Sequence, residues 1–295
     1  MKLLWPLILL LVSFPQYGFA IDPGRIQGFF QVNEQAVVLT QAYAHLHDNA
    51  EGLLGRPQEL RILLVDREVP QEALAGISLL AVEQMAKDGG VQGLLLKLDP
   101  NDQKRLEVTP LYSPAEPGQT LMTRTISAIG QKPPIKLKIS RQRVSGAVEY
   151  FEARQSETGG MPRLAYSLRF SAPLFHEMPV TARLTGQAAK NSPQMRVLLE
   201  KVRALEKGDF KSVQRLSTER ANRRNRAFLA QTGPEAESLA KQAAAEMKES
   251  TKRLQRVVVR GDRAVAIFAG KQWRSFVREG GEWKSDNGAP GYVSR

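Results

Sequence analysis

In the first half of the chain, short apolar runs alternate with polar turns at the spacing that β-strands require. Each run has the length of a strand, and Pro-rich or Gly-rich joints separate several of them. The predicted strands lie at residues 29–32, 36–39, 60–65, 91–98, 106–112, 135–140, 144–151 and 164–171. Between the third and fourth strands, apolar residues from Leu74 to Met85 recur at helical spacing after Pro70. The pattern predicts a β-rich antiparallel sheet or sandwich with one helix.

In the last third of the chain the order reverses, with helices first and strands afterwards. Apolar positions at helical spacing predict one helix that ends at Gly208, a second that starts near Phe210 and a third after Pro234. Short strands follow at residues 256–259, 264–268, 273–277 and 283–285. Gly-Asp and Gly-Gly pairs, which favour hairpin turns, join two pairs of these strands. The pattern predicts helices packed on a curled antiparallel sheet, so the fold class is α+β.

The chain has 295 residues, which is more than a single compact core usually organises. We expect a β-rich N-terminal unit at residues 21–190 and a second unit at residues 193–288, with a tail at 289–295. A turn-rich and proline-containing joint at residues 186–193 separates them.

Residues 1–20 have the anatomy of a secretory signal peptide. Lys2 gives a positive start, residues 3–14 are almost wholly apolar, and small residues precede a cleavage site after Ala20. A membrane-spanning helix needs about 20 apolar residues, and this stretch is shorter and is followed by Pro15. We therefore expect cleavage, no membrane anchor in the mature chain, and a periplasmic or secreted protein.

Composition and charge limit the kinds of site and partner that the chain can have. The chain contains no cysteine, which excludes disulfides, thiolate metal sites and cysteine nucleophiles. Residues 21–192 hold 19 Lys or Arg against 18 Asp or Glu, whereas residues 193–295 hold 22 against 12. This basic C-terminal unit suggests an acidic partner, although a surface charge that only keeps the protein soluble explains the same excess.

The densest basic cluster lies in a predicted helix of that unit. Its members are Arg220, Arg223, Arg224 and Arg226. The first three share one helical face, which can bind the phosphates of an anionic envelope component. A solvated helix face is the alternative. We do not expect nucleic acid, because no aromatic side chains interleave with the arginines to stack on bases.

Two histidines form the sharpest local cluster. His45 and His47 are two apart, so on a strand both imidazoles point to one side and can meet one metal ion. The only other histidine, His176, stands far along the chain, and nothing in the spacing brings it near. The alternative is a polar strand end that enters a loop.

The sequence contains few other candidates for a catalytic or ligand-binding site. The GxSxG, HExxH and GxxxxGK[ST] motifs are absent, and the C-terminal unit has no histidine. We therefore expect no catalytic base there and no cofactor. We also expect no serine enzyme of the S-x-x-K type. Trp273 and Trp283 can line a cavity for a small apolar ligand, but aromatic residues on strands more often fill a core.

The C-terminal unit resembles a known superfamily. The segments ALEKGDF at 204–210, VVVRGD at 257–262 and GEWK at 281–284 are similar to the cone-shaped nuclear-transport-factor-2-like superfamily, especially its secreted bacterial members. Such cones host enzymes, ligand carriers and interaction modules. The N-terminal pattern, from Val32 to Ala44, is similar to domains of uncharacterised exported bacterial proteins.

These observations favour a non-catalytic exported protein that binds a ligand or an envelope partner. The alternative is a periplasmic metal-dependent enzyme that uses His45 and His47.

Overall fold

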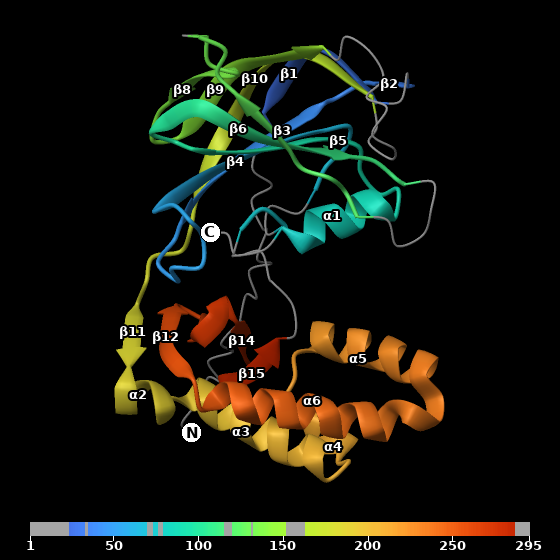
Figure 1. Ribbon diagram of the computed structural model, residues 1–295, viewed down its shortest axis with the longest axis vertical. Helices are drawn as coiled ribbons and strands as arrows, with labels where there is room; N and C mark the ends of the chain where they lie inside the picture. The colour runs from blue at the N-terminus through green and yellow to red at the C-terminus, as the bar shows by residue number, and fades with distance from the viewer. Residues whose placement is uncertain are drawn as a thin grey trace, which may run out of the picture.

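The computed structural model describes residues 24–32, 35–69, 73–75, 79–114, 120–130, 132–151 and 163–286. These residues form a ten-stranded sheet, a second sheet of five strands, and a group of helices that packs on the second sheet (Figure 1). The predicted α+β class is confirmed.

The ten-stranded sheet belongs to the first part of the chain. Its strands are β1 (Arg25–Val32), β2 (Gln35–Val37), β3 (Gln41–Asp48), β4 (Gln58–Val65), β5 (Gly93–Asp99), β6 (Asp102–Leu111), β7 (Arg124–Ser127), β8 (Ile135–Ile139), β9 (Arg143–Phe151) and β10 (Leu164–His176). The path runs β2-β1-β10-β3-β4-β5-β6-β7, and β9 and β8 extend from β10. All pairs are antiparallel except β10 with β3, which run parallel.

The long strand β10 folds this sheet into two layers. Its first part pairs with β1 and β9, and its last residues, from Leu174 to His176, pair with β3. Strands β1, β8, β9 and β10 therefore lie above β3, β4, β5 and β6 (Figure 1). Apolar side chains of both layers, such as Phe30 and Ile62, form one core.

Helix α1 (Leu80–Lys87) covers the other side of the lower layer (Figure 1). Strands β3, β4 and β5 are consequently buried on both faces. The helix occupies the second half of the predicted helical segment, and residues 70–72 and 76–78 lie outside the described part. Arg61 Nη1 donates to Leu74 O at 2.8 Å and joins the sheet to this covering layer.

The second sheet has the order β11-β12-β13-β14-β15 and is antiparallel throughout. Its strands are β11 (Ala182–Thr185), β12 (Leu254–Arg260), β13 (Arg263–Phe268), β14 (Trp273–Glu279) and β15 (Glu282–Asp286). The helices are α2 (Gly186–Lys190), α3 (Pro193–Glu206), α4 (Phe210–Arg215), α5 (Glu219–Thr232) and α6 (Ala236–Thr251). The helices and strands predicted for this unit are thus present.

Local signals explain where these helices begin. Pro193 occupies the first turn of α3, and the Ser192 side chain accepts a hydrogen bond from the Met195 N–H at 3.3 Å. Asp209 caps α4 in the same way by accepting from the Ser212 N–H at 3.0 Å. Gly208 has a φ of 68°, which favours glycine and lets the chain break between α3 and α4.

The chain passes from the first sheet to the second at residues 177–181, earlier than the predicted joint. Strand β11 pairs with β12, and α2 follows directly, so residues 186–193 are α2 and the start of α3. Residues Ala182–Thr185 show no clear strand pattern in the sequence, because this short strand is only half-buried. Among the described residues, no helix is both long and apolar enough to cross a membrane.

Candidate functional site

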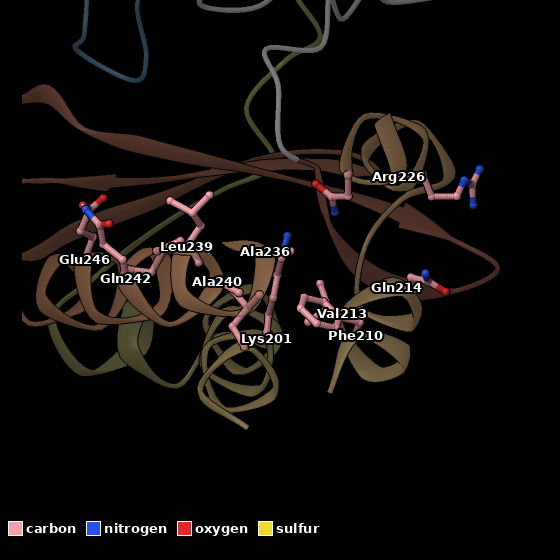
Figure 2. Close-up of a pocket in the computed structure, with 14 residues that line it drawn as sticks. Lys201, Phe210, Val213, Gln214, Arg226, Ala236, Leu239, Ala240, Gln242 and Glu246 are labelled. Carbon is pink, nitrogen blue, oxygen red and sulfur yellow. The ribbon is translucent and has the colours of Figure 1, made fainter. Parts of the chain in front are cut away.

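The clearest candidate binding site is a pocket of about 340 Å³ among α3, α4, α5 and α6 (Figure 2). Its wall is mainly apolar, and its apolar members include Leu205, Phe210, Val213, Leu239, Ala240 and Met247. Polar side chains also line it, and those that are exposed mark its mouth: Gln214, Arg226, Gln242 and Glu246. The site therefore has an apolar interior and a polar rim.

The sequence of α6 leaves the space for this pocket. Ala236, Ala240 and Ala243 all line it and recur at helical spacing, so three positions on this face of α6 carry only a methyl group beside the larger Leu239 and Met247. Figure 2 shows Phe210 and Val213 of α4 on the other side. The chain breaks at Gly208, so α4 is a separate short helix that forms this wall of the pocket.

Lys201 is the unusual member of the lining. It extends from α3, is only 2% exposed, and its Nζ donates to Ser285 Oγ at 3.1 Å. Burial and the charge of Arg274 lower the pKa of Lys201 to about 8, against the opposing effect of Asp286. A buried lysine costs stability, and such groups are concentrated at functional sites.

The predicted arginine cluster lies on α5, and two of its members pair with carboxylates. Arg220 Nε donates to Asp286 Oδ1 at 3.3 Å, and its Nη2 donates to Asp286 Oδ2. Arg226 Nη2 pairs with Glu219 Oε1 at 2.8 Å. Arg223 is exposed, and the side chain of Arg224 lies outside the described part. Arg220 thus binds the last residue of β15. The spacing of the arginines alone could not predict this contact.

The two tryptophans lie on opposite faces of the second sheet. Trp283 is in the core between the sheet and α3, beside Phe276 and Leu198, and Arg278 lies over its ring at 4.8 Å. Trp273 packs with Val258 and with Leu53 of the first sheet's loop. Neither lines the pocket among the described residues.

His45 and His47 share a buried carboxylate partner that the sequence did not indicate. The His47 Nδ1–H donates to Glu177 Oε2 at 2.7 Å, and His45 Nε2 is 3.5 Å from the same oxygen. The parallel pairing of β10 with β3 brings Glu177 to them. His176 is exposed, with its Nε2 3.1 Å from Arg141 O, and does not join the cluster.

The metal hypothesis finds little geometric support in this cluster. Within the described ranges, no group of three or more His, Cys, Asp or Glu side chains is arranged to hold a metal ion. Both ring nitrogens of His45 and Nε2 of His47 are buried without a hydrogen-bond partner. Burial and the charge of Arg61 keep the pKa of His45 well below its usual value, so this imidazole is neutral.

A second cavity of about 580 Å³ lies on the α1 side of the first sheet. Its lining is charged, and several of the charges pair with one another: Glu59 binds both Arg56 at 2.5 Å and Arg61 at 2.8 Å, and Lys97 lies 3.6 Å from Glu107. Because its central charges are already paired, we regard the cavity as part of the polar cover of the sheet.

One short motif lies beside the first pocket. Ser238 and Lys241 on α6 have the S-x-x-K spacing of some acylated serine enzymes. Lys241 is exposed and its Nζ pairs with Glu237 Oε1 at 2.7 Å, so it is not placed as a base for Ser238.

A scan against protein-family models and searches of curated proteins and of solved structures found no significant match to this chain.

Proposed function

We propose that this chain is a non-catalytic exported protein, periplasmic or secreted, whose C-terminal unit binds a small amphipathic ligand. The observation that carries the proposal is the apolar pocket of about 340 Å³ with a polar rim among α3, α4, α5 and α6. Pockets that bury small ligands begin at about this size and combine apolar walls with few polar groups. Export rests on the signal pattern of residues 1–20, which lie outside the described part.

The resemblance to nuclear-transport-factor-2-like cones agrees with this proposal. Helices packed on a curled antiparallel sheet are what membership of that superfamily implies, and we propose that membership for residues 193–288. Since such folds host several kinds of activity, the pocket and not the fold carries the functional argument.

The charge of the C-terminal unit favours an anionic headgroup. Residues 193–295 hold 22 Lys or Arg against 12 Asp or Glu, and both Arg226 at the rim and Lys201 inside line the pocket. A long-range positive potential raises the local concentration of anions. The proposed ligand therefore has an apolar tail within the pocket and an anionic head at its mouth.

The alternative of a metal-dependent enzyme draws less support. His47 Nδ1 already binds Glu177, and the described residues supply no third ligand for His45 and His47. The two histidines have a simpler role as buried polar groups near the junction of the two sheets. We do not propose metal chemistry.

Calorimetric titration with decanoate tests the proposal, and decanol serves as the uncharged counterpart. Ala243→Leu places a larger side chain into the pocket, and the matched control is Ala245→Leu, which is exposed on the same helix and does not line the pocket. We expect wild type and A245L to bind decanoate alike and A243L to bind about tenfold or more weakly, because overfilling a packed site costs roughly 1–3 kcal/mol.

Binding of decanoate more tightly than decanol supports the anionic headgroup. Equal affinity of A243L and A245L would place the ligand elsewhere, and no binding of either probe by wild type would remove the proposed pocket function.

A further inference from the structure

The upper layer of the first sheet has one face that nothing in the described structure covers. Along β1, β8, β9 and β10, alternate residues such as Phe30, Val148 and Leu168 point into the core. The intervening residues point outward, and Figure 1 shows this layer at the end of the molecule farthest from the helices. We call these outward residues the outer face.

Basic side chains gather on the outer face. The exposed ones are Arg25 on β1, Lys136 and Lys138 on β8, Arg143 on β9 and Arg169 on β10. None of the five has an ion-pair partner among the residues that the structure describes, and the exposed acidic residue on the same face is Glu149. The net charge of residues 21–192 does not reveal this cluster of basic side chains, because that part of the chain is nearly neutral as a whole.

The strand register places these charges close together. One row across the four strands reads Lys138, Ser145, Ser171 and Arg25, and the next reads Lys136, Ala147, Arg169 and Gln27. Neighbouring strands are about 4.8 Å apart, so each row spans roughly 15 Å. Arg143 lies beside the first row, with its Nε donating to Ser171 Oγ at 3.2 Å. Between the basic residues the side chains are small, namely Ser145, Ala147 and Ser171.

An exposed aromatic pair borders the basic rows. Phe29 is 44% exposed and Phe151 is 56% exposed, and their ring centroids are 5.7 Å apart. Phe29 is opposite Ser167 of β10, in the row after Arg169. Two large apolar side chains kept in water beside unpaired cations mark an interaction surface.

We propose that the outer face binds the surface of a membrane rich in anionic lipid. An uncovered face of four strands offers a broad area to a bilayer, the five cations complement lipid phosphates, and the two phenylalanines can enter the boundary between headgroups and acyl chains. Helices α3 to α6, which line the C-terminal pocket, lie at the opposite end of the molecule (Figure 1). This proposal does not rest on the proposed pocket function.

Vesicle co-sedimentation tests it with the chain from Ile21 onward, which contains every described residue. The probes are vesicles of phosphatidylcholine alone and of phosphatidylcholine mixed with phosphatidylglycerol, over a salt series. The test variant is Arg25→Gln with Lys138→Gln and Arg169→Gln. The matched control removes the same charge at exposed residues of the other unit, as Lys207→Gln with Lys211→Gln and Arg215→Gln.

We expect salt-sensitive binding to the anionic vesicles only. The test variant should bind about a hundredfold more weakly, since each basic residue near an anionic surface contributes about fivefold, and the control should resemble wild type. Phe29→Ser with Phe151→Ser, which leaves all charges in place, should reduce the binding that persists at high salt.

Three results would overturn the proposal: no binding of wild type to anionic vesicles at low salt, equal binding by the test and control variants, or capture by soluble polyphosphate with no binding to vesicles. Circular dichroism of each variant confirms that the comparison is between folded proteins.

Discussion

Arg260 of β12 and Glu51 of the loop between β3 and β4 form a buried ion pair that joins the two sheets. Arg260 Nε donates to Glu51 Oε1 at 2.9 Å, and each side chain is 4% exposed. The same guanidinium also donates to Asp48 and to the carbonyl oxygen of Met178. The predicted sequence units are therefore held together by a charged contact as well as by apolar packing around Trp273.

Replacing Arg260 with Met should destabilise the whole chain. The change leaves the Glu51 carboxylate buried without its partner, and breaking a buried pair in this way costs about 3 kcal/mol. Denaturant unfolding measures the loss, and limited proteolysis should cut faster at residues 177–181, where the chain passes between the sheets. Arg183→Met, at an exposed position of β11, is the control. A loss in R260M no larger than that in R183M would contradict the structural role of the pair.

The buried Lys201 predicts a stability that rises with pH. Its pKa is lowered to about 8 in the folded chain, so the unfolded chain holds this proton more tightly and charge on Lys201 opposes folding below pH 8. Lys201→Met removes that cost and should be more stable than wild type at neutral pH by roughly 3 kcal/mol. The difference should shrink between about pH 8 and pH 10.5 as the wild-type lysine loses its proton.

Denaturant unfolding of both proteins across this pH range measures the difference directly. A wild-type curve parallel to that of K201M at every pH would show that Lys201 does not titrate in this window.

His45 predicts the same direction of change, a stability that rises with pH, but on the acid side. Its folded-state pKa is held well below the usual value by burial first and by the charges of Arg61, His47, His176 and Arg260 after it. The stability from this neutral imidazole is fully present above the unfolded pKa of about 6.5 and is lost as pH falls below it. His45→Leu should lose less stability than wild type between about pH 6.5 and pH 5. Thermal unfolding at each pH checks this, and equal losses would show that His45 protonates without cost.

The regular parts of this fold were accessible from the sequence because their patterns are local. The helical repeats of α3, α4 and α6 and the hairpins of β12 to β15 depend on residues close in the chain. The two-layer arrangement of the first sheet was not accessible. It depends on the parallel pairing of Leu174 with Ala44, and β3 carries histidines where an apolar strand pattern would continue.

In the candidate sites, too, local patterns could be predicted from the sequence and long-range contacts could not. The spacing of His45 and His47 predicted that they share one side, and they do meet one group, but that group is Glu177 from a distant strand. The pocket depends on what α6 lacks, since Ala236, Ala240 and Ala243 look like ordinary helix formers in the sequence. The sequence did not indicate that Lys201 is buried, because burial of one lysine in an amphipathic helix depends on tertiary packing.

Methionine methyl resonances test the central claim that the helical pocket holds an amphipathic ligand. Met247 lines the pocket, whereas Met85 packs against the core of the first sheet. In spectra of the chain labelled at its methionine methyl carbons, titration with decanoate should shift the Met247 signal to saturation and leave the Met85 signal in place. Met247→Leu assigns the resonance. An unchanged Met247 signal at all decanoate concentrations, or a shift confined to Met85, would contradict the proposed pocket.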